Sequence, residues 1–479
     1  MRHGSIWTPV FCRSAMLGMS LSLTAAAVLT ISAPRATAQQ KETPPAVGEP
    51  KAFRLPERRS FTLDNGMQVS MVPFGTVPKV YVRLGIMAGN ANESADHIWL
   101  ADVTGDLLQE GTTSRSADQL AREVAAMGGA LSVSVGPDRS NVMGDVLSAR
   151  GPAFVRVLAD VVRHPRFPES ELPRIINNRS RQLAIAKSQP QAIASERFAK
   201  LIYGDHPYGR IYPTEAMLKG YTIDEVRSFW HDNVGAARAH LYVTGVFDAD
   251  AMERAIREAF GDWERGPAPA SVAPPAPPAA RSVALIDRPN AVQSTIYLGL
   301  RVPGPTDPNW VPFAVTNSLL GGAFGSRITT NIREQKGYTY SPYSFINAAK
   351  EGAYWAETAD VTTNVTGPSL TEIFGEIDRL QREAPSHAEL HGIQSYIAGT
   401  FILQNSSRSG VAGQLAYVDL YGLGDDWLRS YVQHVLAVTP EQVQEMTERY
   451  LHPEKMQLVV VGDKKVVEPQ LAKWATVAP

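Results

Sequence analysis

Asp102 and Asp106 are a pair of residues whose type and spacing could do chemistry. They lie in the segment 99–109, where apolar residues recur on one face of a predicted helix that ends at Gly111. Side chains at i and i+4 share a helix face, so the two carboxylates could contact one cation. Hard cations such as Mg²⁺ and Ca²⁺ need about six or more oxygen ligands, so this pair alone predicts weak binding at most. The simpler interpretation, two acids on a solvated or cleft-facing helix surface, is the one we favour.

His387 and His391 also have the i, i+4 spacing of zinc ligands, and Glu389 lies between them. Glu389 is two positions from each histidine and therefore projects about 200° around the helix from His387. This places the carboxylate away from the face that the histidines share. We therefore predict an exposed helix rather than a metal site.

Arg333 and Tyr340 are a third candidate group. A guanidinium and a phenol can donate hydrogen bonds to a peptide carbonyl and to the oxyanion that forms when water attacks it. The preceding segment 321–327 holds three glycines, which let the backbone approach a partner closely, and Ser326 could cap the next helix. That helix is predicted to pass through Arg333 and to precede a strand over 338–346. Residue types alone favour a surface helix residue and a half-buried strand residue.

A proline-rich segment divides the chain into two pieces. Each piece contains a similar set of predicted helices and strands, and these must position the candidate residues. Residues 266–280 contain six prolines and six alanines in 15 positions, which predicts an extended, semi-rigid linker between 60–265 and 281–479. In each piece, strands precede a helix, further strands and several helices. We predict an α+β fold of two similar domains, each a mostly antiparallel sheet with helices packed on one face.

The individual elements are predicted from periodicity and turn residues. The first piece should contain a hairpin over 61–69 that turns at 64–66, strands at 80–87 and 239–244, and helices at 99–109, 170–187, 191–203 and 223–233. The second piece should contain strands at 282–286, 295–301, 338–346 and 456–461, and helices at 311–320, 370–383, 389–404 and 440–450.

The N-terminal segment has the pattern of an export signal. Arg2 and Arg13 precede an uncharged apolar stretch over 15–31, and a small-x-small cleavage pattern ends at Ala38. We therefore predict a signal peptide over 1–38, an N-terminal extension over 39–59, and a periplasmic or secreted protein. The alternative is a retained signal anchor, because the apolar stretch approaches the length that spans a bilayer.

Composition excludes several classes of protein. The chain has 479 residues, 44% hydrophobic and 20% charged, which is typical of a soluble protein with two or more domains. A formal net charge of −2 gives no indication of nucleic-acid binding. No second long apolar stretch follows the first, so no membrane association is expected after cleavage. Cys12 is the single cysteine, which excludes a disulfide framework and a thiolate zinc cluster.

Five stretches in order resemble the M16 family of zinc metallopeptidases, the relatives of pitrilysin, insulinase and the mitochondrial processing peptidase. The length and the two-part organisation resemble the short members of that family, which assemble as paired chains. The five stretches are FTLDNGMQV (61–69), VYVRLGIMAGNANE (80–93), HPRFPESEL (164–172), GDHPYGR (204–210) and LGGAFGSRITTNIREQKGYTYSPYS (320–344).

Active members of the family carry His-x-x-Glu-His on the helix after the second strand, and a later glutamate completes the zinc site. The Gly-Thr ending of that helix is present here, and aligning on it puts Asp102 and Asp106 at the histidine positions. Gly105 then stands at the general-base position. The later glutamate position falls near Pro173, and Glu171 is the nearest carboxylate. The resemblance thus implies a chain with no catalytic residues, metal or cofactor of its own.

The second half keeps the family's pattern. Arg333 and Tyr340 match its Arg/Tyr pair, which reaches across a closed chamber towards the zinc site of the first domain or of a partner chain. The resemblance implies a zinc-free subunit of an exported heterodimer, whose zinc-bearing partner cleaves a peptide bound between the chains, along a sheet edge. Two alternatives stay open: a non-enzymatic peptide-binding or scaffold protein, and an independently active peptidase with an altered metal site. The glycine-rich segment resembles the family's substrate loop, represented here by Gly321, Gly322, Phe324 and Gly325.

Overall fold

The computed structural model describes residues 56–269, 272–278 and 280–474. The predicted signal peptide and most of the predicted extension lie outside the described residues. Within the described ranges, no helix is both long and apolar enough to cross a membrane.

The first sheet has six strands in the order β1-β2-β6-β3-β5-β4. β2 and β6 are parallel, and the other neighbouring strands are antiparallel. The predicted hairpin is present, and Gly66 at its turn has φ +92°, a conformation that glycine adopts without steric cost. The strands are β1 (Arg59–Thr62), β2 (Gln68–Pro73), β3 (Lys79–Ile86), β4 (Leu131–Val135), β5 (Ser140–Leu147) and β6 (Ala239–Gly245).

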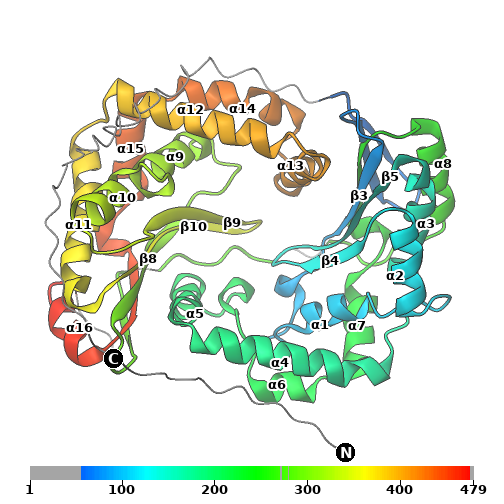
Figure 1. Cartoon of the computed structure of the whole chain (residues 1–479), viewed down its shortest axis with the longest axis horizontal. Coiled ribbons are helices and arrows are strands. Elements are labelled where there is room, and N and C mark those ends of the chain that lie inside the picture. The colour runs from blue at the N-terminus through cyan, green and yellow to red at the C-terminus, as the bar shows by residue number, and fades with distance from the viewer. Residues whose placement is uncertain (1–55, 270–271, 279, 475–479) are drawn as a thin grey trace, which may run out of the picture. The chain divides into compact units, whose positions relative to one another are not determined.

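The second sheet has five strands in the order β7-β11-β8-β10-β9. Its last strand in sequence, β11, lies parallel to the first strand, β7, and antiparallel to β8. β6 has the same place between β2 and β3, so five strands of each sheet share one topology. This confirms the predicted pair of similar, mostly antiparallel domains. Figure 1 labels β3, β4 and β5 of the first sheet and β8, β9 and β10 of the second. The strands are β7 (Val283–Asp287), β8 (Gln293–Val302), β9 (Tyr343–Ala349), β10 (Gly352–Thr362) and β11 (Gln457–Gly462).

The helices follow the amphipathic segments of the sequence. Those of the first half are α1 (Leu100–Leu107), α2 (Ala117–Ala126), α3 (Gly151–Arg163), α4 (Leu172–Ser188), α5 (Pro190–Tyr203), α6 (Glu215–Gly220), α7 (Ile223–Asn233) and α8 (Ala249–Phe260). Those of the second half are α9 (Trp310–Asn317), α10 (Arg327–Thr329), α11 (Thr366–Arg382), α12 (His387–Gln404), α13 (Arg408–Tyr421), α14 (Asp425–Ala437), α15 (Pro440–Tyr450) and α16 (Lys464–Leu471).

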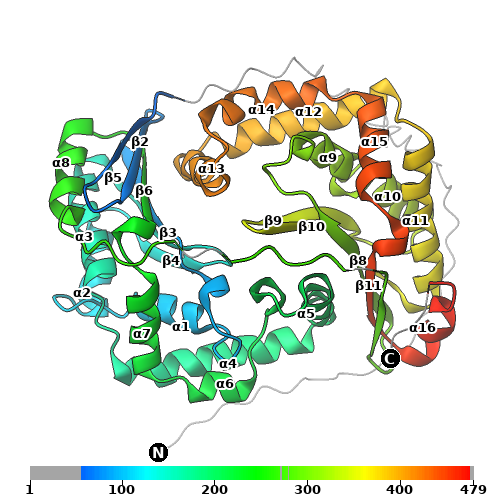
Figure 2. The same cartoon turned by 180° about the vertical axis from the view of Figure 1, so that it is seen from behind.

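Each half also places one helix on the sheet of the other half, which adds to the predicted layer of helices on one face. In β6, Leu241 and Val243 belong to the core of the first half, whereas Tyr242 packs with side chains of α13. In β11, Leu458 belongs to the core of the second half, whereas Val459 packs with side chains of α5. Successive strand residues point to opposite faces, so each sheet is covered on both sides. Figure 2 shows α13 beside β3 and α5 near β8.

Polar contacts join the two halves at the same places. Arg408 of α13 bonds through Nε and one terminal nitrogen to the two carboxylate oxygens of Asp145, at 2.9 and 3.1 Å. The backbone carbonyl of Arg408 accepts a hydrogen bond from Thr244 Oγ1 at 2.8 Å. The described linker residues are in neither helix nor strand, and Arg238 Nε donates to the carbonyl of Ala268 at 2.9 Å. Arg301 of β8 also donates to the carbonyl of Pro275 at 2.9 Å, so the linker is held against both halves.

One predicted strand is displaced, and one predicted helix is divided. The strand expected over 338–346 is β9, which starts at Tyr343 because Pro342 has no N–H to donate to a ladder. The helix expected over 311–320 is α9 followed by a π-helical turn, Ser318–Gly322. The next helix is short α10, followed by a second π-helical turn, Thr330–Gln335. This helical segment ends before Gly337, whose φ of +66° is typical of a glycine that follows a helix.

Candidate functional site

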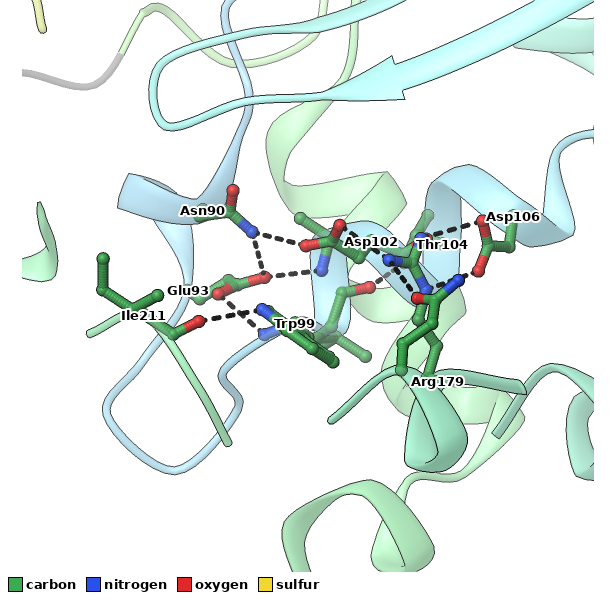
Figure 3. A network of polar contacts seen from close by, with 11 residues as sticks. Asn90, Glu93, Trp99, Asp102, Thr104, Asp106, Arg179 and Ile211 are labelled. Carbon is green, nitrogen blue, oxygen red and sulfur yellow. Dashed lines mark hydrogen bonds and ion pairs between the residues drawn. The ribbon is translucent and has the colours of Figure 1, made fainter. Parts of the chain in front are cut away.

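The start of α1 is held by a buried carboxylate from the preceding loop. Glu93 accepts hydrogen bonds from the backbone N–H of Trp99 at 3.1 Å and of Ala101 at 2.7 Å. These N–H groups belong to the first turn, which has no intrahelical acceptors for them. Burial raises the pKa of Glu93 to about 8, and the hydrogen bonds from Ala101 and Asn90 oppose that rise. Glu93 therefore fixes the position of α1, which carries the two aspartates (Figure 3).

Arg179 of α4 joins the two aspartates of α1 (Figure 3). Its guanidinium donates to both carboxylate oxygens of Asp106, at 2.7 and 2.8 Å, and to Asp102 Oδ1 at 3.1 Å. The second oxygen of Asp102 accepts from Asn90 Nδ2 at 2.8 Å. Burial alone would lower the pKa of Arg179, but the two carboxylates raise it. The pair predicted to share a helix face does so, and its shared cation is an arginine of the same chain.

This donor set does not fit zinc. A zinc site needs three or four nitrogen, sulfur or carboxylate ligands, and each catalytic site keeps one position open. The oxygens of Asp102 and Asp106 are already bonded to Arg179 and Asn90. In the part of the chain that the structure describes, no group of three or more metal-ligating side chains could hold an ion.

Gly105 fills the remaining motif position on α1, and its surroundings are tight. A Cβ atom added there would lie 2.8 Å from Cγ2 of Val135 and 3.4 Å from Cγ1 of Val133. Both valines belong to β4, which packs on α1. A glutamate could therefore replace Gly105 only if the side chain of Val135 shifted, and glycine itself can accept no proton.

The residue of α4 that contacts the aspartates is not the one that the sequence indicated. Pro173 lies in the first turn of α4, where proline is tolerated. Glu171 forms an ion pair with Arg174 at 2.8 Å. Arg179, six positions after Pro173, makes the contact, and sequence reasoning missed it. The register between two helices that are 73 or more residues apart in the chain has no signal in a single sequence.

The second candidate group converges on one pocket of about 320 Å³. Arg333 projects from the second π-helical turn, and its Cζ lies 4.3 Å from the ring centroid of Phe324 and 4.9 Å from that of Tyr340. Gly321 and Gly322 of the first π-helical turn also line the pocket. The structure thus brings together every predicted residue of this group except Gly325, which does not line it. Arg333 sits between two aromatic faces, an arrangement that favours a cation.

Gly321 lies directly above a buried acid that the sequence did not indicate. A Cβ added to Gly321 would lie 2.5 Å from Ser344 Oγ and 2.6 Å from Glu357 Oε2, so only glycine fits. Glu357, on β10, is fully buried, and neither of its carboxylate oxygens has a hydrogen-bond partner among the described residues. Burial raises the pKa of Glu357 well above its ordinary value, so this carboxyl group keeps its proton.

Two details around the pocket differ from the predictions. Tyr340 is not a half-buried strand residue: it precedes β9, and its side chain is mostly exposed. Ser326 stands at the N-cap of α10, but its hydroxyl donates to Thr329 Oγ1 at 3.0 Å instead of accepting from a backbone N–H. The helix therefore begins without the predicted side-chain cap.

The histidine pair of α12 does not form a metal site. Glu389 bonds in bidentate fashion to Arg327 of α10, at 2.7 and 2.9 Å. This pairing lowers the pKa of Glu389. His387 and His391 are both exposed on the same helix, as predicted.

Comparisons with known proteins agree with this fold. Residues 75–213 match the family model described as insulinase (peptidase family M16), and residues 220–396 match the model described as peptidase M16 inactive domain. An uncharacterized zinc protease of Bacillus subtilis is 23% identical over 354 residues, which cover 73% of this chain and 85% of that protein. An uncharacterized zinc protease of Mycobacterium leprae is 26% identical over 345 residues, which cover 68% of this chain and 77% of that protein.

Solved structures show the same fold. A crystal structure described as a peptidase M16 inactive domain from Pseudomonas fluorescens aligns with a TM-score of 0.78 at 23% identity, covering 85% of this chain and 98% of that one. A protease from Helicobacter pylori aligns with a TM-score of 0.80 at 19% identity, covering 85% of this chain and all of that one. Together the two family models cover most of both halves, and the chain belongs to the M16 family of peptidases.

Proposed function

We propose that this chain is the zinc-free subunit of an exported M16-type heterodimeric peptidase. It supplies substrate binding and transition-state contacts, and a zinc-bearing M16 chain supplies the hydrolytic centre. One observation carries the proposal: Arg179 saturates the two aspartates at the zinc-motif positions, whereas Arg333 lies in an open pocket.

The family membership supports a role in peptide hydrolysis. The residues at the two sites support a zinc centre in the partner chain and substrate contacts in this chain. Two of the relatives are named zinc proteases, although the donor set around Asp102 and Asp106 does not fit zinc. Gly105 cannot act as a general base. A chain of this kind needs the metal chemistry of another subunit to cleave a peptide.

The pocket in the second half offers the complementary chemistry. The guanidinium of Arg333 and the phenol of Tyr340 can donate to the carbonyl oxygen of a bound peptide, and to the oxyanion formed from it. The two side chains lie together in this structure, with the guanidinium against the phenol ring. The backbone of Gly321 and Gly322 forms part of the pocket wall beside them.

The proposal includes export to the periplasm or outside the cell, and the signal peptide predicted over 1–38 supports this part of it. Export is testable by N-terminal sequencing of the protein from its native host, which should begin at Gln39.

Reconstitution tests the proposal. The chain from residue 39 onward is purified alone, and together with an M16 chain of the same genome that carries an intact His-x-x-Glu-His motif. Hydrolysis of an unstructured fluorogenic peptide should require both chains, and the partner's glutamate-to-glutamine variant should abolish it. Hydrolysis by the present chain alone, or no gain from adding it to the partner, would contradict the proposal.

A further inference from the structure

The pocket around Arg333 has an unbalanced charge. Arg333 is the one charged side chain among the described residues that line it. Glu334 forms an ion pair with its Nε at 3.2 Å, but that carboxylate is more than half exposed and does not line the pocket. The lining therefore presents a positive charge with no acid facing it.

The terminal nitrogens of Arg333 are available for a ligand. Within the described residues, no side chain or carbonyl accepts a hydrogen bond from them, and the guanidinium carbon lies over the rings of Phe324 and Tyr340, at 4.3 and 4.9 Å from their centroids. Arg327, six positions earlier, is the opposite case, since Glu389 already accepts from its Nε and from one terminal nitrogen. A guanidinium held by stacking keeps its edge free for a bidentate acceptor.

The acid behind the pocket does not neutralise this charge. Glu357 lies beneath Gly321, and burial without a partner keeps its carboxyl group protonated. No ionised acid therefore competes for the guanidinium from the inside of the pocket. The surroundings favour an anionic ligand group from outside.

Three aromatic side chains beside the pocket are unusually exposed. Phe324 is 71% exposed, Tyr340 77% and Tyr343 52%, and all three line the pocket. Large aromatic side chains gain free energy when they are covered. Their exposure around one cation suits a ligand that has an apolar side chain next to its anionic group.

We infer that this pocket binds a peptide carboxylate that lies next to an aromatic or large apolar residue. Arg333 takes the carboxylate in an end-on bidentate contact, which leaves one N–H on each terminal nitrogen for the peptide carbonyl of the proposed function. Phe324, Tyr340 and Tyr343 cover the neighbouring side chain. The carboxylate comes from an acidic side chain or from the peptide's C-terminus, which share this chemistry. That the ligand is a peptide rests on the proposed function. The inference adds which peptides bind: those with a carboxylate next to an aromatic or large apolar residue.

Four short peptides of one background sequence test the inference with the chain from residue 39 onward alone. Two contain an internal Phe-Asp or Phe-Asn pair and end in an amide, and two end at Phe with a free carboxylate or an amide. We expect at least one carboxylate peptide to bind about tenfold tighter than its matched amide peptide, by calorimetry. The pair that shows the difference identifies the source of the carboxylate. The difference should shrink as salt is raised.

Variants separate this pocket from a general effect of charge. Arg333→Gln should remove the difference in affinity between the carboxylate and amide peptides. Arg333→Lys should keep only part of that difference, because lysine cannot make the bidentate contact. Arg382→Gln, an equal loss of charge at an exposed position of α11, should leave it unchanged. Thermal unfolding checks that each variant is folded.

Three results would overturn the inference. The acid and amide peptides could bind equally, the Arg333→Gln variant could still prefer the acid peptide, or none of the peptides could bind. Equal and tight binding of all four peptides would leave the proposed peptide-binding subunit intact. Failure of the reconstituted complex to hydrolyse peptides would overturn the proposed function, while the binding preference would still be measurable.

Discussion

Arg179 in the first half and Arg333 in the second half show two uses of the same side chain. Arg179 bonds to both carboxylates that face it, and both of its partners come from α1. Arg333 is held by stacking between Phe324 and Tyr340, with its terminal nitrogens left for a ligand. The guanidinium of Arg179 is paired with acids of the same chain, whereas the terminal nitrogens of Arg333 are available to a ligand.

Under the proposed function, the difference corresponds to a peptidase fold that lost its metal site and kept its substrate contacts. At the metal position an internal cation compensates the acids, so the region is stable without an ion. At the pocket Arg333 has one exposed ion pair, with Glu334, and its terminal nitrogens have no acceptor among the described residues, which leaves them for a ligand. The two regions therefore call for different experiments: stability at the first and binding or turnover at the second.

The largest expected effect is that of Arg333→Ala on turnover by the reconstituted complex. Removing a charged donor to the developing oxyanion should lower the rate by about 10²–10³, roughly 3–4 kcal/mol. Assembly should be normal by gel filtration, since the change opens no core cavity. A variant complex that assembles and cleaves at the wild-type rate would make this chain a scaffold.

Arg179→Ala should have the next largest effect, on stability. It leaves Asp102 and Asp106 without their cation, with exposed side-chain fractions of only 19% and 34%. We expect the free energy of unfolding in urea to fall by about 2–3 kcal/mol, since an uncompensated, partly buried charge is costly. Arg181→Ala, at an exposed position of α4, is the matched control and should cost less than about 0.5 kcal/mol. Similar losses in both variants would show that Arg179 is not a structural cation.

Glu357→Gln should change how stability depends on pH. The folded chain keeps the Glu357 proton because burial raises its pKa, whereas the unfolded chain releases it above its ordinary pKa. The stabilising effect of this proton is fully present below the unfolded pKa and is lost as pH rises towards the folded pKa. Relative to the glutamine variant, the wild type should therefore lose up to about 1.4 kcal/mol per pH unit as pH rises above the ordinary pKa of a glutamate. If the free energy of unfolding in urea depends on pH in the same way for the wild type and Glu357→Gln, Glu357 would have a polar partner that stabilises its ionised form.

Tyr340→Phe should have the smallest effect. The ring that stacks on Arg333 is kept, and one hydroxyl donor is lost. We expect about a tenfold fall in turnover by the reconstituted complex, smaller than that of Arg333→Ala. A loss as large as that of Arg333→Ala would indicate that the hydroxyl, rather than the stacked guanidinium, is the main donor.

Much of the fold could be predicted from residue patterns, because hydrophobic period and turn residues are local signals. Helix Pro440–Tyr450 and helix Ile223–Asn233 begin and end at the predicted residues. β10, over Gly352–Thr362, was not predicted: it is buried on both faces and lacks a clear alternation. The π-helical turns were also missed, because they depend on how Gly321 packs over Ser344 and Glu357.

The candidate site was predictable in part for the same reason. Asp102 and Asp106 share a face because of their spacing along one helix, and Arg333 lies near Tyr340 because few residues separate them. Arg179 and Glu357 reach their places through packing between distant segments, which no local pattern encodes.

The zinc content of the purified chain from residue 39 onward tests the central claim most directly. The protein is incubated with Zn²⁺, dialysed without chelator, and measured by mass spectrometry of the metal, beside a variant with Asp102→Ala and Asp106→Ala. The account predicts no stoichiometric zinc in either protein, because Arg179 holds both carboxylates. One tightly bound zinc per chain, lost in the double variant, would contradict it.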